Sequence, residues 1–304
     1  MATVTAKQIA KYREAYSAAK GLTDTPINPL VSTYKEAALR ISESMLSLGT
    51  DFKRAQAAST LRQISAILAA TDADTKKWVE RNVPEFYYAG VVRADTKTTA
   101  LKAKLSQDAI KDLPSVSGLT GAAFNKVHGA QIEAIVTSTY NDFANGLTLT
   151  YKNAERTISE AQRVAIRRKM AETTIEGTTL KAKTAAIKKT FTNTGIVAIR
   201  DRSGKAWQLD VYAKMLGRTK QMQAHNTAVG MRMVEHGFDL AIISGHGSTC
   251  PSCGEWEGRI ISLTGATKGY PTLEDVEGNS GHIFGPNCRH VFDPYHPELA
   301  SRTK

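Results

Sequence analysis

Cysteine is scarce in this 304-residue chain, which has three cysteines and none before residue 250. A small, odd number of cysteines at one end of a chain excludes a secreted fold that disulfides hold together. No stretch comes near the about 20 consecutive apolar residues that cross a bilayer, so we expect no membrane span. Residues 1–20 are polar and lack the apolar core of a signal peptide. These absences predict a protein of a reducing, cytoplasmic compartment.

Motifs of several enzyme classes are missing as well. No phosphate-binding glycine loop occurs, which excludes an ATP-driven motor of that type, and no His-Glu-x-x-His pair of a metallopeptidase occurs. A zinc deaminase needs His-x-Glu ahead of Pro-Cys-x-x-Cys. Here His296-Pro297-Glu298 follows the cysteines, and Thr249 precedes Cys250. We therefore predict that the chain is not an enzyme.

The three cysteines form two short motifs. Cys250 and Cys253 make a C-x-x-C knuckle, and Cys288 is followed by Arg289 and His290 as C-x-H. Three thiolates and one imidazole complete the tetrahedral shell that Zn²⁺ prefers, and such a shell leaves no open position for water or a substrate. We therefore predict a structural Zn²⁺ held by Cys250, Cys253, Cys288 and His290.

Alternatives to this ligand set stay open. Cys250 and Cys253 can be a redox dithiol, but a motif of that kind opens a helix after a strand, whereas the sequence around this pair predicts a loop. The fourth ligand can also be His246 or His282, since both lie close to the cysteines in sequence. The thiols can, finally, be inert.

The formal net charge of +11 is concentrated in one part of the chain. Residues 151–190 contain ten lysines and arginines against four glutamates, so more than half of the excess lies there. A basic helical face favours contact with double-stranded DNA or with an acidic protein surface. The alternative is a helix whose charges are simply solvated.

The sequence up to about residue 193 predicts helices. Apolar residues recur every three or four positions from Leu30 to Leu48, as on one buried face of a helix that Gly49 ends. A second helix is expected from about Asp51. Pro84 and the aromatic residues 86–88 predict an irregular connection. Further helices are expected at about 122–145 and within the basic segment from about 153 to 190, the latter interrupted at Gly177.

From Gly195 the pattern changes to short strands. Residues 196–199 and 206–209 predict a hairpin, a helix follows at about 210–235 with Gly237 placed to end it, and strands are expected at 240–243 and 259–261. The remaining C-terminal residues are expected to form loops. They include so few apolar residues that a bound metal would be needed to stabilise them. The predicted fold class is α+β, with a mainly α-helical region over residues 1–193 and a small, zinc-stabilised α+β module over residues 194–304.

Several blocks of residues in this C-terminal part occur in a familiar order. They are Asp201-Arg202-Ser203-Gly204-Lys205-Ala206-Trp207-Gln208-Leu209, Tyr212, Met215, Arg218-Thr219, Glu235-x-Gly237, Ser244-Gly245-His246, the C-x-x-C pair with Trp256 and Gly258, and Gly285-Pro286-Asn287-Cys288-Arg289-His290. Over roughly residues 195–297 the chain resembles the minor capsid, or head-morphogenesis, proteins of tailed bacteriophages. Such proteins often end this block in His-Pro-Asn-Cys-Arg-Cys. A histidine in place of the last cysteine is an exchange that a zinc ligand tolerates, which favours His290 over His282.

The resemblance implies a virion protein that is assembled in the host cytoplasm and present in a few copies. It implies attachment to the portal or the major capsid protein and a role in head assembly or DNA packaging. One rival function is a zinc-dependent nuclease or another effector delivered to the host, with His282 or His290 as the base and Asp275 and Glu277 as the nearest carboxylates. Another is a cellular nucleic-acid-binding zinc protein.

Overall fold

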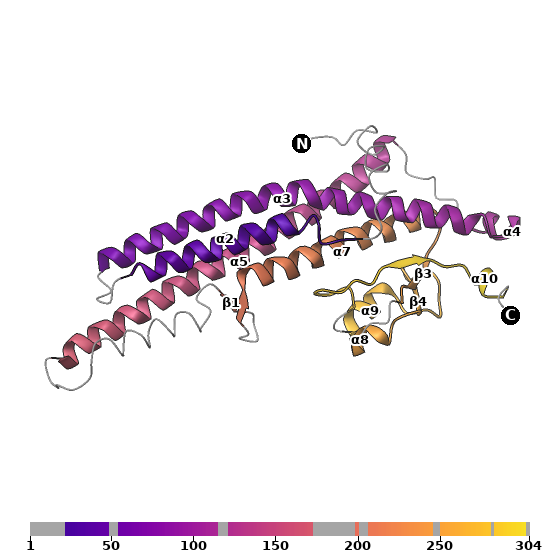
Figure 1. The fold of residues 1–304 in the computed structure, drawn as a ribbon. Helices are drawn as coiled ribbons and strands as arrows, with labels where there is room; N and C mark the ends of the chain where they lie inside the picture. The colour runs from indigo at the N-terminus through magenta and orange to yellow at the C-terminus, as the bar shows by residue number, and fades with distance from the viewer. Residues whose placement is uncertain are drawn as a thin grey trace. The chain divides into compact units, whose positions relative to one another are not determined.

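The computed structural model describes residues 22–48, 54–114, 121–172, 198–200, 206–245, 250–280 and 283–301. Over these ranges the chain is mostly helical and adds small antiparallel sheets, which confirms the α+β class in its coarse form. In chain order the elements shown in Figure 1 are α2 (Asn28–Leu46), α3 (Arg54–Lys102), α4 (Gln107–Lys111), α5 (Gly121–Glu172), β1 (Ala198–Arg200), β2 (Ala206–Gln208), α7 (Leu209–Glu235), β3 (Leu240–Ile243), α8 (Pro251–Gly254), β4 (Ile260–Ser262), α9 (Leu273–Ser280), β5 (Phe292–Pro294) and α10 (Pro297–Ser301).

The chain divides into two compact units, and the divisions fall inside α3, α5 and α7. Unit 1 contains Glu80–Ser138 and Leu216–Lys304 together with Asp24, and unit 2 contains Thr25–Val79 and Thr139–Met215. The domain boundary predicted between residues 193 and 194 lies outside the described residues and stays a prediction.

Unit 2 is built around the apolar stripe of α2. Leu30, Tyr34, Ile41 and Met45 are buried, as the three- and four-residue spacing predicts. The ring of Tyr34 packs against Phe143 of α5 with centroids 5.9 Å apart. Phe143 in turn meets the edge of Trp78 on α3 at 6.1 Å. Aromatic contacts between three helices therefore form the centre of this unit.

The irregular connection predicted at Pro84 is wrong, because α3 continues through this proline. A proline inside a helix removes one hydrogen bond and costs about 3 kcal/mol. Phe86, Tyr87 and Tyr88 lie two to four residues after it and are 0%, 0% and 4% exposed. Burial of a large apolar side chain contributes about 1.5–3 kcal/mol, so these neighbours together outweigh the cost of the proline.

The helix predicted at about 122–145 is also longer than expected, because α5 runs without a break from Gly121 to Glu172. Gly146 lies within it and does not end it. A Cβ atom added at Gly146 would come 2.8 Å from Cε1 of Tyr212 on α7, so the glycine permits a close approach of two helices. The interruption predicted at Gly177 lies outside the described residues.

The predicted hairpin and the helix after it are confirmed. β1 pairs antiparallel with β2, with Ile199 opposite Trp207. α7 then ends at Glu235, and Gly237 takes a φ of +86°. The N–H groups of Gly237 and Phe238 donate to the carbonyls of Val234 and Met233, the hydrogen-bond pattern of a Schellman motif. Gly237 therefore ends the helix as the sequence predicts.

The C-terminal residues form more structure than the loop that we expected. β3 lies between β4 and β5 in an antiparallel sheet, with Ala241 opposite both Ile261 and Pro294. α8, α9 and α10 add short helices beside it (Figure 1). The buried core of this sheet is continuous with α3 and α7, since it includes Ala94, Val229 and Met233. The C-terminal sheet therefore does not rely on its own few apolar residues alone, because α3 and α7 supply part of its core.

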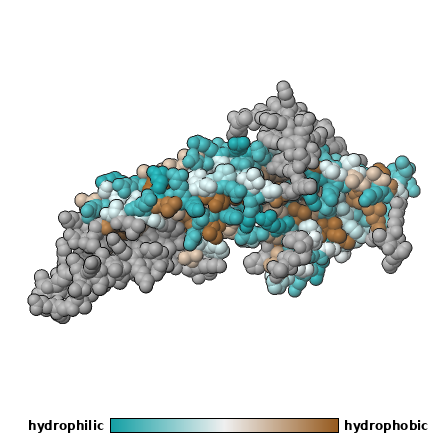
Figure 2. All heavy atoms as spheres, viewed as in Figure 1, coloured by the Kyte–Doolittle hydropathy of each residue, from teal (hydrophilic) through white to brown (hydrophobic). Residues whose placement is uncertain are grey.

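Among the described residues, no helix is long and apolar enough to cross a membrane. Figure 2 shows hydrophilic side chains over much of the described surface in this view, with hydrophobic ones in small groups. The large exposed apolar side chains are spread over α2, α4, α5 and α7, and the three on α5, Val127, Leu149 and Val164, are at least 15 residues apart. Scattered apolar residues of this kind are ordinary on a protein surface.

Candidate metal centre and buried ion-pair network

The C-x-x-C knuckle lies at the start of α8 in unit 1. Cys250 is the residue before the helix, and its carbonyl accepts hydrogen bonds from the N–H groups of Cys253 and Gly254 at 3.1 and 2.9 Å. Pro251 occupies the first helical position, where its missing N–H is not needed. The prediction of a loop here is therefore wrong. One turn of helix forms instead, and it directs Cys253 into the core of unit 1.

A tight turn places the second motif. The N–H of Cys288 donates to the carbonyl of Gly285 at 3.1 Å, with Pro286 and Asn287 between them. Asn287 has a φ of +59°, a conformation that asparagine tolerates better than most residues. Proline followed by a residue with positive φ is the pattern of a type II turn. The Pro-Asn-Cys sequence is thus explained by the turn that presents Cys288.

Three of the four predicted ligands meet at one point. The Sγ atoms of Cys253 and Cys288 and a ring nitrogen of His290 all lie within 4.8 Å of one another. The exposed fractions of these residues are 4%, 8% and 1%. Two sulfurs and one imidazole in a buried cluster are suited to a metal ion such as Zn²⁺. These residues can therefore hold a metal ion.

The cysteine thiols differ in their ease of ionisation. Burial, followed by hydrogen bonding to Cys250 and the nearby charge of Cys288, raises the pKa of Cys253 to about 12. Hydrogen bonds from the backbone and the thiol of Cys253 lower the pKa of Cys250. Cys250, the half-buried residue before α8, does not belong to the group of three ligand atoms that lie within 4.8 Å of one another. A metal cation would stabilise thiolates in this apolar setting, where burial otherwise keeps Cys253 protonated.

The imidazole of His290 makes contacts on both sides. Its Nδ1 lies 3.2 Å from Sγ of Cys288, and its Nε2 lies 3.0 Å from Oε1 of Glu257. The amide of Asn226 on α7 donates to the backbone carbonyl of His290 at 2.8 Å. Arg289, between the two ligands, pairs with Asp24 at 3.2 Å, and Arg218 of α7 pairs with the same carboxylate. The ligand segment is therefore fixed from several directions.

The sequence also offered two histidines and two carboxylates as candidate site residues. His246 and His282 lie outside the described residues, so their rivalry with His290 stays open. Asp275 accepts hydrogen bonds from the N–H and hydroxyl of Thr272 and so caps the start of α9. Glu277 lines a cavity of about 560 Å³ beside α7, and burial raises the pKa of its carboxyl. These two carboxylates therefore serve different sites and do not form a metal-binding pair with each other.

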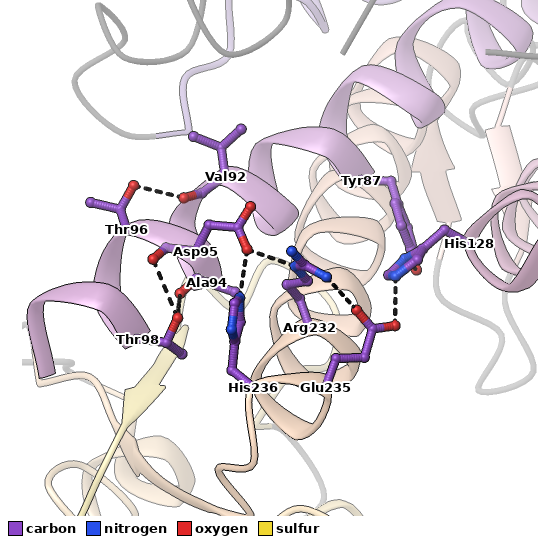
Figure 3. Close-up of polar contacts among 10 residues, drawn as sticks. All are labelled: Tyr87, Val92, Ala94, Asp95, Thr96, Thr98, His128, Arg232, Glu235 and His236. Atoms are coloured by element: carbon purple, nitrogen blue, oxygen red, sulfur yellow. Dashed lines mark hydrogen bonds and ion pairs between the residues drawn. The ribbon is translucent and has the colours of Figure 1, made fainter. Parts of the chain in front are cut away.

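A second cluster of polar side chains lies inside unit 1, between α3, α5 and α7 (Figure 3). Tyr87 and Glu235 contact opposite ring nitrogens of His128, both at 2.8 Å. Arg232 donates to Glu235 at 2.8 Å and to Asp95 at 2.6 Å. Asp95 is also 2.7 Å from Nε2 of the remaining member, His236. We call this chain of contacts, from Tyr87 through His128, Glu235, Arg232 and Asp95 to His236, the ion-pair network.

The ion-pair network compensates for the burial of its charges. Burial raises the pKa values of Asp95 and Glu235, but hydrogen bonds from His236 and Arg232 to Asp95, and from His128 and Arg232 to Glu235, outweigh it and lower both. Burial, followed by the nearby charges of Glu235 and Tyr88, raises the pKa of the Tyr87 hydroxyl. Both carboxylates are thus held ionised, and they fix three helices to one another.

Sequence reasoning missed most of these partners. Glu257, Asn226 and Asp95 are distant in sequence from the groups they contact, and no local pattern marks them. A signal did exist at the end of α7, where Glu235 and His236 lie three and four residues after Arg232. Charged residues grouped on one helical face in this way indicate a partner opposite them.

Comparison with known proteins identifies the family of the chain. No curated protein and no solved structure is significantly similar to the chain. A family model described as phage minor capsid protein 2 matches residues 55–304. The match includes α3 from its second residue, α5, α7 and the cysteine module, by which we mean the part from β3 to α10 that contains both cysteine motifs. The match extends well beyond the C-terminal part in which the sequence motifs lie. The chain therefore belongs to the phage minor capsid protein 2 family.

Proposed function

We propose that this chain is a structural virion protein that attaches to the portal or to the major capsid protein and acts in head assembly or DNA packaging. Its strongest support is the family match over residues 55–304, because it includes the long helices as well as the C-terminal module. We also propose that each virion contains a few copies of the chain and that the chain is assembled in the host cytoplasm.

The proposed role of the cysteine module is mechanical, with one structural Zn²⁺ bound by Cys250, Cys253, Cys288 and His290. The buried cluster of two sulfurs and one imidazole supports it. The turn at the start of α8 keeps Cys250 next to this cluster, since its carbonyl accepts a hydrogen bond from the N–H of Cys253 at 3.1 Å. When bound, the metal would tie α8 to the turn before β5. A redox dithiol needs only the C-x-x-C pair. It gives no reason for Cys288 and His290 to lie at the same point, so we favour the metal.

The basic segment is the part that we propose to face packaged DNA or an acidic protein surface. In the described part of this segment, Lys152, Arg156 and Arg163 are exposed, whereas Ala154 and Ile158 are buried. The positive charges therefore point away from the packed face of α5. Residues 173–190, with four more lysines, lie outside the described residues. Contact with DNA would release counterions and weaken as salt is added.

The rival functions receive less support. The family match does not favour a nuclease, a delivered effector or a cellular zinc protein. Of the two carboxylates considered for a nuclease, Asp275 caps α9 and Glu277 borders a separate cavity. A nuclease would require divalent-metal-dependent cleavage of plasmid DNA by the purified chain, lost in His282→Ala with the fold retained.

Mass spectrometry of purified virions tests the proposal. The chain should be present in fewer copies than the major capsid protein, and it should copurify with portal rings or capsid shells when it is tagged. Absence from purified virions and from assembling heads would refute the structural role. DNA binding by the chain that does not weaken between 50 and about 200 mM salt would refute the proposed electrostatic contact of residues 151–190.

A further inference from the structure

The ring of His290 is held between a sulfur and a carboxylate. Nδ1 faces Sγ of Cys288 at 3.2 Å, and Nε2 faces Oε1 of Glu257 at 3.0 Å. The histidine is 1% exposed and the Glu257 side chain 19% exposed. A neutral imidazole has one N–H and one lone pair, and a carboxylate can only accept a hydrogen bond. The proton therefore belongs on Nε2, which leaves the lone pair of Nδ1 directed at the sulfurs.

We infer that Glu257 is a positioning residue of the metal centre, which fixes the tautomer and the orientation of His290 so that Nδ1 is the ligand atom. This inference rests on the metal binding proposed above. Histidines that bind metals commonly donate their second ring N–H to a carboxylate, and this contact both orients the ring and makes the ligand nitrogen more basic. Glu257, which lies outside the two cysteine motifs, supplies such a contact to His290.

The backbone around Glu257 is suited to hold it in place. The N–H of Gly258 donates to the carbonyl of Ile243 at 3.0 Å, and the N–H of Trp256 donates to the carbonyl of Cys253, also at 3.0 Å. The turn that bears Glu257 is thereby tied to β3 on one side and to α8 on the other. The main chain of His290 is held separately, by Asn226.

Competition between the full-length chain and a chelator of known affinity, with Zn²⁺ and with Co²⁺, tests this inference. Glu257→Ala should weaken metal binding by about 10–100-fold, the usual effect of removing such a partner. Glu257→Gln keeps an oxygen that accepts the Nε2 proton, so it should restore most of the affinity. The matched control is Glu255→Ala, an exposed glutamate in the same turn, which should bind metal like the wild type.

A second readout identifies the ligand atom. Long-range nitrogen NMR of the histidine rings in the zinc-loaded chain should show His290 bound through Nδ1 and protonated on Nε2. Metal bound through Nε2, or equal affinities for Glu257→Ala and the wild type, would overturn the inference and leave the metal centre intact. A wild-type chain that binds no metal would overturn the metal centre itself. If Glu257→Ala fails to fold, the same nitrogen NMR measurement on Glu257→Gln tests the inference. His290 bound through Nδ1 would support it, and His290 bound through Nε2 would overturn it.

Discussion

Nε2 of His128 lies 2.8 Å from Oε1 of Glu235, so that a residue of α5 is joined to a residue of α7 through buried groups. Their side chains are 1% and 8% exposed. The second oxygen of Glu235 accepts from Arg232, which also reaches Asp95 on α3. Glu235 therefore has donors on both of its oxygens, and its removal affects contacts to all three helices of unit 1.

Glu235→Ala should lower the free energy of unfolding by about 3–5 kcal/mol, because it takes the acceptor away from a partly buried guanidinium and a buried imidazole. Urea unfolding of the full chain at neutral pH measures the change. Glu133→Ala is the control, since Glu133 is an exposed glutamate on α5, and it should stay within about 0.5 kcal/mol of the wild type. Equal effects of the two substitutions would show that the ion-pair network does not stabilise the fold.

The carboxylate of Asp239 gives a pH dependence. Hydrogen bonds from Ser262, Thr264 and Thr267 outweigh the effect of burial and lower the pKa of Asp239. A carboxyl whose pKa is lowered by folding adds stability above its unfolded pKa of about 3.9, and this stability is lost as the pH falls through the folded value. The unfolding free energy of the metal-free wild type should thus fall more steeply below about pH 4 than that of Asp239→Asn. Parallel curves would contradict this prediction.

Gly237 should resist substitution for two separate reasons. Its φ of +86° disfavours any residue with a Cβ, and an added Cβ would lie 2.9 Å from the carbonyl oxygen of Pro114. Gly269 has a similar φ of +88° with open space around it, so Gly269→Ala isolates the cost of the backbone conformation, about 1 kcal/mol. Gly237→Ala should cost clearly more in thermal or urea unfolding. A cost no larger than that of Gly269→Ala would show that the contact with Pro114 relaxes freely.

Two glycines of α5 should respond with opposite signs to alanine. Gly129 has nothing within 4 Å of an added Cβ, so Gly129→Ala should stabilise the chain by about 0.5–1 kcal/mol through helix propensity. Gly146→Ala should destabilise it, because the added methyl group would press on the ring of Tyr212 at 2.8 Å. Melting temperatures of the two variants check the sign. Stabilisation by both would mean that α5 and α7 can separate at Gly146 without cost.

Local patterns in the sequence predicted those elements that local physics decides. The stripe of α2, the hairpin of β1 and β2 and the end of α7 at Gly237 depend on spacing and backbone conformation within a few residues, and all are confirmed. Pro84 was misinterpreted, and the helix expected to end near residue 145 continues through Gly146, because packing partners from other helices decide the outcome at both places. A proline or glycine has a local cost, but the aromatic neighbours or the close helix contact that outweigh it are visible only in three dimensions.

The candidate site divides in the same way. Sequence spacing identified Cys253, Cys288 and His290, because metal ligands must be of a few residue types and the chain has few cysteines. Glu257, Asn226 and the members of the ion-pair network are ordinary polar residues in sequence. Their roles come from long-range contacts, such as the one between Asp95 and His236, which no local pattern encodes.

Cys253→Ser should remove the metal and loosen the module while the long helices persist. Hydrogen exchange should increase from about residue 240 onward. Because the core of the module includes Ala94, Val229 and Met233, α3 and α7 should retain much of it even without metal. Uniform exchange along the whole chain, or unchanged exchange in the module, would disagree with a metal that stabilises this part alone.

The zinc content of the full-length chain, purified without added metal, tests the metal centre most directly. Elemental mass spectrometry should find one zinc ion per chain in the wild type and none in Cys253→Ser, and the metal-free wild type should melt at a lower temperature than the loaded one. A folded wild-type chain without zinc, with the same melting temperature before and after zinc is added, would contradict the account.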